Sequence, residues 1–308
     1  MRVLRLVLPA IVTFMAIGLA IPLLMDGGRD AGGITSNVTL VLTRDYGREV
    51  LGLETFSPSS GMTAMEMIRN VTQIETRYGG LFLSGAYGLR SNRSGGMDWF
   101  YYVNGYYMDR GLASYRPLEG DVVQVDYHYW GSYGASPGFL SGYPSRLAYG
   151  LYGKRGNLTL VASEGLVKVA SKLGKDLAGI FSLEYLVLGS AEASLEALAQ
   201  NTIVLALPSD QEKISWILDL RRNQLWPSSL GEGTVWLNGA SKGRRVRLQQ
   251  GASIQCLDLP GGRWILIVLA TDEEWAEEAV DLLAKGEPLG FQAGLALTSN
   301  GTVPLPVD

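Results

Sequence analysis

Hydrophobic and polar residues follow different patterns in successive parts of the 308-residue chain. An uninterrupted apolar run comes first, alternating strand-like segments around one helical repeat come next, and short apolar runs separated by helical repeats fill the second half. Strands alternate with a period of two and helices with a period of 3.6, so a change of period marks a change of structure. The pattern predicts five parts: an anchor or signal segment (1–25), a tether (26–36), a first domain (37–130), a linker or loop (131–156) and a second domain (157–308).

The first apolar run predicts a membrane segment. Residues 6–25 carry no charge, and Arg2 and Arg5 precede them. About 20 apolar residues in a helix match the ~30 Å hydrocarbon layer, and basic residues before the run keep the N-terminus cytoplasmic. A cleaved signal peptide is the alternative, because Gly18-Leu19-Ala20 offers small residues, although the run is longer than the usual ~7 to 15 residues. We expect an uncleaved single-pass anchor in the cell membrane, with the bulk of the chain extracellular.

The aromatic stretch from Asp98 to Trp130 predicts a hairpin and a closing strand. Asn104-Gly105 tolerates the positive φ values that a two-residue turn requires, and β-branched and aromatic residues flank it. The closing strand alternates two sets of side chains: Val123, Val125, Tyr127 and Tyr129 on one face, and Gln124, Asp126, His128 and Trp130 on the other. We expect the first face to be core and the second to be wet.

A capped helix is predicted upstream of this stretch. Thr63 precedes Glu66 by three positions, which is the spacing of a capping box, and Met62, Met65 and Ile68 recur at helical intervals. Methionines at that spacing are far more often core residues than metal ligands. We therefore expect this helix to be covered by the surrounding strands.

These residues resemble a known family. Trp99, Asn104-Gly105, Gly111 and Gly120-Asp121, followed by a Tyr-rich strand, are similar to the W-x-x-x-x-N-G … G-D pattern of the transcobalamin C-terminal-like domain. The resemblance covers roughly residues 37–130. It implies a β-grasp-type module, found in cobalamin carriers and in many bacterial and archaeal surface proteins. Such a likeness indicates the fold more strongly than the ligand, because one fold serves many functions.

The second half predicts an α/β domain with a mostly parallel sheet covered on both sides. Its apolar runs and its helical repeats alternate, as buried parallel strands and their covering helices do. The expected strands are 158–162, 185–188, 202–207 and 264–270, and the expected helices are 164–173, 191–200, 209–222 and 272–285. Residues 234–238, 244–248 and 253–259 are expected to form a more exposed antiparallel insertion.

Two loops of this half follow strands and open helices, at residues 189–192 and 208–210. Helix N-termini at the carboxyl ends of parallel strands suit anionic groups, whereas Ser190 and Ser209 are equally the residues of ordinary helix caps. Both interpretations stay open from the sequence.

Residues 131–156 are rich in Gly, Ser, Pro and Tyr and have no periodicity. That composition predicts a linker or a long surface loop. The alternative is an aromatic loop folded over a ligand, since exposed aromatic rings are costly. Its aromatic residues would be Tyr133, Phe139, Tyr143, Tyr149 and Tyr152.

Composition excludes several kinds of chemistry. The net charge of −4 gives no positive field for a phosphate backbone, so nucleic acid is not an expected partner. One His and one Cys cannot build a His-rich zinc site or an intramolecular disulfide, and the chain lacks GxGxxG, GxxxxGK[ST] and GxSxG motifs. We expect no enzyme, no catalytic residues and no metal site.

The polar face of the closing strand is the predicted ligand site. The neighbouring strand adds one of two sets, and parity alone does not choose between them. The sets are Trp99, Tyr101 and Val103, or Phe100, Tyr102 and Asn104. An aromatic and polar wall of this kind suits a planar macrocycle such as cobalamin or another corrinoid. His128 could ligate its cobalt, although a lone His on a strand is usually an ordinary hydrogen-bonding residue. The full predicted site is Trp99, Tyr101, Tyr102, Asn104, Gln124, Asp126, His128 and Trp130.

Two functions therefore stay open. The first is a membrane-anchored, non-enzymatic protein that binds a small ligand and serves uptake, with a surface or transport protein as partner. The second is a structural or adhesive surface protein that uses the β-grasp module as an assembly surface.

Overall fold

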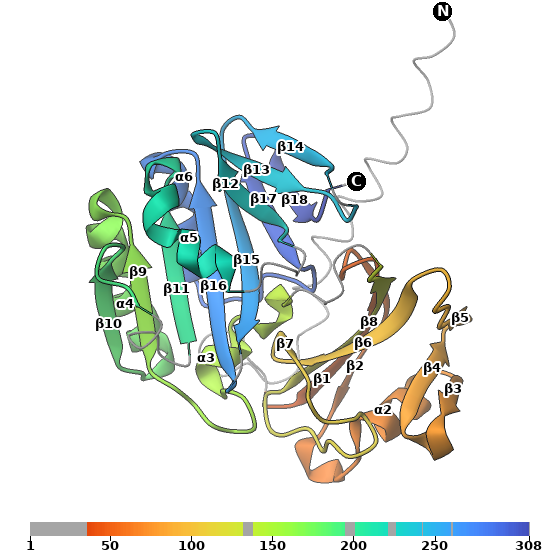
Figure 1. Cartoon of the computed structure of the whole chain (residues 1–308). Coiled ribbons are helices and arrows are strands. Elements are labelled where there is room, and N and C mark those ends of the chain that lie inside the picture. The colour runs from red at the N-terminus through yellow and green to blue at the C-terminus, as the bar shows by residue number, and fades with distance from the viewer. Residues whose placement is uncertain are drawn as a thin grey trace, which may run out of the picture.

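The computed structural model describes residues 36–131, 138–194, 201–220, 226–241, 243–259 and 261–307. They form a sheet-rich mixture of strands and few helices, with two sheets side by side (Figure 1). The predicted membrane segment and nearly all of its tether lie outside the described residues. Within the described ranges, no helix is both long and apolar enough to cross a membrane.

A five-stranded sheet, called the first sheet below, has the order β2-β1-β8-β6-β7. β1 and β8 are parallel, and the other neighbours are antiparallel. The predicted Asn104-Gly105 turn joins β6 to β7 with φ values of 49° and 70°. The strands are β1 (Val38–Arg44), β2 (Glu49–Phe56), β6 (Met97–Val103), β7 (Tyr106–Tyr107) and β8 (Val122–Tyr129).

Helix α2 (Ala64–Val71) covers one face of the first sheet, as its periodicity predicts. The capping box is present: Thr63 Oγ1 accepts from the Glu66 N–H at 3.3 Å, and the Glu66 carboxylate accepts from the Thr63 N–H at 2.7 Å. Met65 and Ile68 are fully buried in the core beneath the helix. A three-stranded ribbon follows, with β3 (Ile74–Arg77), β4 (Phe82–Ala86) and β5 (Leu89–Arg90).

The second half contains a seven-stranded sheet, called the large sheet, in the order β10-β9-β11-β16-β15-β17-β18. The first four strands are parallel, as predicted, and β15, β17 and β18 join antiparallel. The strands are β9 (Leu158–Ala162), β10 (Tyr185–Gly189), β11 (Asn201–Ala206), β15 (Ala252–Leu259), β16 (Arg263–Ala270), β17 (Gly294–Thr298) and β18 (Gly301–Leu305).

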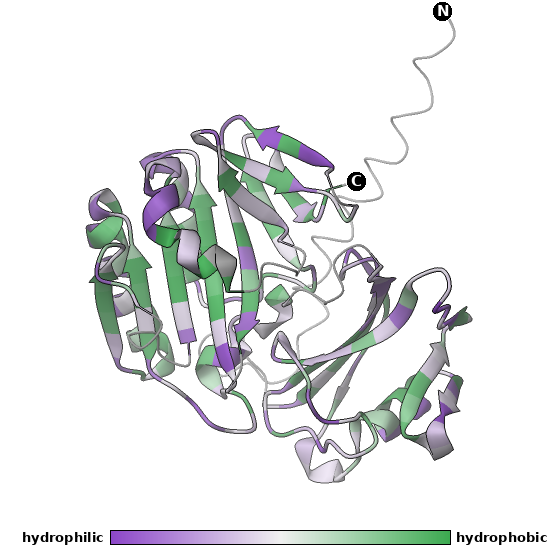
Figure 2. Ribbon diagram, viewed as in Figure 1, coloured by the Kyte–Doolittle hydropathy of each residue, from purple (hydrophilic) through white to green (hydrophobic). Residues whose placement is uncertain are grey.

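Both faces of the large sheet are covered. Helices α4 (Val167–Phe181) and α6 (Glu273–Ala284) pack on one face. Helix α5 (Gln211–Asp219) and a separate antiparallel sheet of β12 (Ser228–Gly231), β13 (Thr234–Asn238) and β14 (Arg245–Leu248) pack on the other. Apolar residues predominate in the parallel strands β9, β11 and β16 of the large sheet (Figure 2). Most of the predicted helix 191–200 lies outside the described residues.

The prediction for residues 253–259 was wrong. They belong to β15, inside the large sheet between β16 and β17, and every residue of β15 is buried. Only β12 to β14 form the separate antiparallel sheet. Alternation with polar residues such as Ser253 and Gln255 suggested exposure, but those two side chains are fully buried and hydrogen-bond to Ser228 of β12.

The linker prediction for residues 131–156 was also wrong for the described part, 138–156. This segment contains a short 3-10 turn (Leu140–Gly142) and helix α3 (Ser145–Ala148). Leu140, Tyr143 and Leu147 are buried in the core of the large sheet, and the Phe139 ring lies 4.4 Å from that of Tyr102 in the first sheet. The segment therefore joins two cores, because its aromatic and Leu side chains find apolar partners on both sides. Tyr133 lies outside the described residues.

Replacing Phe139 tests whether this segment is core. Phe139→Ala should lower the free energy of unfolding by about 3 to 5 kcal/mol, because a fully buried ring leaves a cavity between the two sheets. Urea unfolding followed by tryptophan fluorescence measures it. The matched control is Tyr78→Ala at a ring that is 67% exposed, where we expect a change within about 0.5 kcal/mol. Equal effects at both positions would contradict the packing described here.

Candidate functional site

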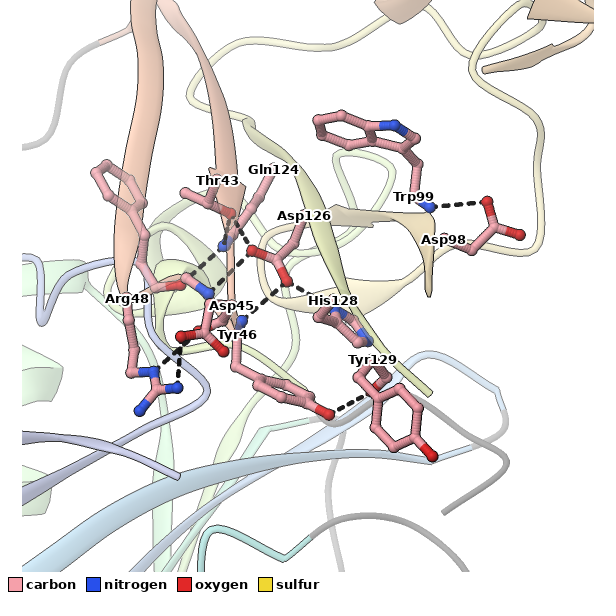
Figure 3. A network of polar contacts seen from close by, with 12 residues as sticks. Thr43, Asp45, Tyr46, Arg48, Asp98, Trp99, Gln124, Asp126, His128 and Tyr129 are labelled. Carbon is pink, nitrogen blue, oxygen red and sulfur yellow. Dashed lines mark hydrogen bonds and ion pairs between the residues drawn. The ribbon is translucent and has the colours of Figure 1, made fainter. Parts of the chain in front are cut away.

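The predicted polar wall of β8 is present, but it is not wet. Gln124, Asp126 and His128 project from one face of β8, opposite the face that α2 covers (Figure 3). All three are buried, and His128 keeps only 1% of its surface exposed. The expectation of a solvated face was wrong because residues of the second half, among them Phe139, Phe291 and Ala293, cover this side of the first sheet.

The Asp126 carboxylate is the centre of the polar network. Its Oδ1 accepts from the Thr43 hydroxyl at 2.5 Å and from the Gly47 N–H at 2.9 Å. Its Oδ2 accepts from the Tyr46 N–H at 3.2 Å and lies 2.6 Å from Nδ1 of His128 (Figure 3). Four donors for one carboxylate compensate for the water that it loses on burial.

Aromatic rings hold His128 from both sides. Its imidazole stacks on Tyr46 with ring centroids 4.6 Å apart and on Phe100 with centroids 4.3 Å apart. The Tyr46 hydroxyl donates to the backbone carbonyl of Tyr129 (Figure 3). A ring clamped between two others and bonded to Asp126 has one orientation, which is the arrangement of a packed polar core.

The turn between β1 and β2 reaches the second half. Asp45, Tyr46 and Gly47 all have positive φ values, of 59°, 59° and 78°. A Cβ atom on Gly47 would lie 1.8 Å from the Phe291 carbonyl oxygen, so only glycine allows this backbone approach. The Ala293 N–H donates to the Tyr46 carbonyl at 3.0 Å, and Gln124 Nε2 donates to the Phe291 carbonyl at 2.7 Å.

The strand register decides the parity that the sequence left open. Trp99 lies opposite Tyr127 and Tyr101 opposite Val125, so both aromatic residues belong to the face covered by α2. Tyr102 lies opposite Gln124 and shares the face of His128. The predicted wall that combined Trp99 and Tyr101 with His128 is therefore wrong, because the sheet separates them. Trp130, one residue past the end of β8, keeps part of its surface exposed.

Asn104 shapes a turn. Its Nδ2 donates to Asp121 at 2.9 Å and to the Gly150 carbonyl at 2.8 Å, and its Oδ1 accepts from the Val122 N–H at 2.8 Å. Asp121 also accepts from the Tyr115 hydroxyl at 2.5 Å. Burial raises the pKa of the Asp121 carboxyl, and these hydrogen bonds offset the rise in part. The Asn104 amide is fully buried and all of its groups are engaged within the chain.

Two further reactive groups, the Cys256 thiol and the Asp210 carboxyl, are also enclosed or hydrogen-bonded within the chain. Burial raises the pKa of the Cys256 thiol, which lies inside the large sheet's core. Burial alone would raise the pKa of the Asp210 carboxyl, but hydrogen bonds from Ser163, Lys213 and Ser209 lower it overall. Asp210 thus occupies the predicted loop at the carboxyl end of β11 with its own partners. In the described part of the chain, no three His, Cys, Asp or Glu side chains gather as a metal site would require.

Several members of the network escaped the sequence analysis. Thr43 could have been found, because it is a polar residue that lies on one side of a mostly apolar strand, with Thr39 and Val41. Tyr46-Gly47 marks a turn but gives no sign of what the turn contacts. Phe291 carries no local signal, because its partner Gln124 is 167 residues away. Phe139 is among the aromatic residues expected to be covered, but nothing near it in the sequence indicates Tyr102 as its partner.

Comparison with known proteins locates a family within the first half. A family described as a domain of unknown function (DUF4430) matches residues 61–129, which include α2 and the strands from β3 to β8. No curated protein matches the chain. Two solved structures show low similarity, and at TM-scores of this size they carry no functional argument.

The first of these structures is a candidate metal-binding protein from Ruminococcus gnavus, with 15% identity over 30% of this chain and 95% of that chain, at a TM-score of 0.26. The second is haptocorrin in complex with Cbi, with 17% identity over 33% of this chain and a TM-score of 0.25. The match spans only 27% of the haptocorrin chain.

Asp126→Asn tests the network. The amide places an NH2 group where the carboxylate accepts hydrogen bonds, so at least one buried donor loses its acceptor. We expect the free energy of unfolding to fall by about 2 to 4 kcal/mol. Asp98→Asn is the control: that carboxylate lies opposite His128 in the register but is only half-buried, and the expected loss is below about 1 kcal/mol. If chemical denaturation finds the two variants equally stable, Asp126 does not have the central role assigned here.

Proposed function

We propose that this chain is a membrane-tethered, non-enzymatic surface protein whose β-grasp-type module is a structural and assembly unit. The observation that carries the proposal is the burial of Gln124, Asp126 and His128 against the second half of the same chain. A ligand-binding wall would keep these groups accessible. Here Gln124 bonds to the Phe291 carbonyl of the second half, and Asp126 fixes the turn at Tyr46 and Gly47 that meets Phe291 and Ala293.

The β-grasp assignment has two supports. The parallel pair β1 and β8 lies within a mixed sheet, and α2 covers one face of that sheet. The sequence pattern around Trp99 and Asn104-Gly105 adds the resemblance to transcobalamin C-terminal-like domains. Both features indicate the fold of the module. Its contacts with the second half of the chain indicate its role.

Backbone contacts from two turns support the structural role. The Asp45–Gly47 turn bonds to Ala293, and the Phe139 N–H donates to the Gly105 carbonyl at 3.2 Å. Arg48 Nη1 donates to the Pro306 carbonyl at 3.1 Å. Hydrogen bonds to main-chain carbonyls depend on position and direction, so together these three give the two sheets one fixed relation. A surface protein that transmits or resists force benefits from such a junction.

The inventory of reactive groups supports a non-enzymatic role. The single His is clamped between rings and bonded to Asp126, and the single Cys is a buried thiol whose pKa is raised. The uncharged run 6–25, with Arg2 and Arg5 before it, supports a membrane tether. The protein would then stand on the outer side of the cell membrane.

Capture of a small planar ligand, such as a corrinoid, is the second candidate. The sequence resemblance favours it, and aromatic side chains at the end of β8 remain accessible: Tyr129 is 38% exposed, and Trp130 keeps part of its surface exposed. A ligand held there would use the rim of the first sheet, with Trp130, and would leave His128 in place. A partner in uptake would be a membrane transport protein.

Protease treatment of intact cells tests the tether. We expect externally added protease to remove the folded part of the chain, because the predicted anchor and tether leave it outside the cell. The mature chain should keep Met1 and enter the detergent phase. Recovery of a soluble protein whose N-terminus lies near Ile21 would instead show a cleaved signal segment and sink the anchored form of the proposal.

Titration with cobalamin and cobinamide separates the two candidate functions. For the structural role we expect no heat and no change of the visible spectrum at ~100 μM ligand, where a working carrier would be saturated. Trp130→Ala and Tyr129→Ala serve as matched variants at the accessible rim. Binding by the natural chain that either variant weakens would replace the structural proposal with the ligand-binding one.

A further inference from the structure

The edges of the described sheets differ in how well they are protected from pairing. An edge strand presents unpaired N–H and C=O groups, and proteins usually guard it with charges, proline or a short length. β14 carries the exposed Arg245 and Arg247, and β18 carries Pro304. β2 carries exposed Glu49 and Glu54, while β7 is two residues long.

β10, at the outer edge of the large sheet, lacks these protections. Its sequence, Tyr-Leu-Val-Leu-Gly, contains no charge and no proline. Tyr185 is 41% exposed and Leu186 is 53% exposed. No other described strand pairs with its outer side. Such an edge is a template for another strand.

The hydrogen bonds to β9 show which groups point outward. The Leu158 N–H donates to the Glu184 carbonyl at 3.0 Å, and the Ser190 N–H donates to the Ala162 carbonyl at 2.8 Å. Even-numbered residues of β10 therefore face β9, and the main-chain groups of Tyr185, Val187 and Gly189 face away. The Gly189 N–H is already bonded to the Glu192 carboxylate at 3.1 Å. Among the residues that the structure describes, the main-chain groups of Tyr185 and Val187 are left to pair.

We propose that β10 pairs antiparallel with β10 of a second copy of this chain, about a two-fold axis at Leu186. In this register Tyr185 of each copy lies opposite Val187 of the other, and each of these pairs exchanges two main-chain hydrogen bonds. The two Leu186 residues face each other as a closely spaced, non-hydrogen-bonded pair. The large sheets of the two copies become continuous.

A second copy fits this edge better than an unrelated strand does. The register matches an aromatic ring to a β-branched side chain twice, and pairs of this kind stabilise sheets. It also places the apolar Leu186 side chains opposite each other. Glu184 falls opposite Leu188, so no like charges meet. The Gly189–Glu192 bond is preserved because Gly189 lies beyond the paired residues. Two-fold symmetry also closes the assembly at a dimer. This inference goes beyond the proposed function and does not depend on the membrane tether.

Cysteine cross-linking tests the register. Opposed Cβ atoms in a non-hydrogen-bonded pair lie ~4.5 to 5.5 Å apart, close to disulfide distance. Leu186→Cys in the full chain should form a covalent dimer under mild oxidation, and the natural chain should not, because Cys256 is buried. Val246→Cys is the matched control, at a side chain that is 50% exposed on the edge of β14. Cross-linking of Leu186→Cys no faster than of Val246→Cys would overturn the proposal.

Introducing a charge at the contact gives a second measure. Leu186→Asp places two carboxylates face to face, so the dimer Kd should rise about tenfold or more. Sedimentation of the full chain in detergent measures the dimer, and Val246→Asp should leave it unchanged. Equal unfolding temperatures of Leu186→Asp and Val246→Asp would show that the charge at residue 186 does not damage the fold. A natural chain that is monomeric at tens of micromolar, or a dimer indifferent to Leu186→Asp, would refute pairing at β10.

Discussion

A carboxylate can be buried only where donors replace its water, and the junction of this protein depends on that constraint at Asp126. The donors come from β1, from the turn after it and from β8 itself. Each of them is fixed by its own strand or turn. The carboxylate therefore selects one arrangement of the first sheet, and the turn that it holds is the one that meets Phe291 and Ala293.

Apolar packing alone would not fix this junction as narrowly. Contacts between aromatic rings such as Phe139 and Tyr102 tolerate a range of separations and angles, whereas hydrogen bonds from Gln124 and Ala293 require defined positions. The two kinds of contact therefore have separate effects. The rings exclude water, and the polar groups set the relative position of the two sheets.

Local signals predicted local structure well. The Asn104-Gly105 turn, the Thr63–Glu66 capping box and the parallel strands of the second half follow from residue type and spacing. The nature of the second face of β8 did not, because polar alternation looks the same whether water or another part of the chain covers it. Buried polar side chains with distant partners mislead a reading of the sequence in this way. Ser253 and Gln255 show the same effect in β15.

The distance along the chain between Asp126 and the residues that cover it affects how the protein is made. Gln124 meets Phe291 across 167 residues. At ~5 to 20 residues per second, a ribosome needs roughly 10 to 30 seconds to add them. During that interval the strands of the first sheet are complete, but the face that carries the carboxylate, the imidazole and the aromatic rings is still uncovered. The segment just before β17, with Phe291 and Ala293, thus covers this face last, and until it is made the face is open to contact with other chains.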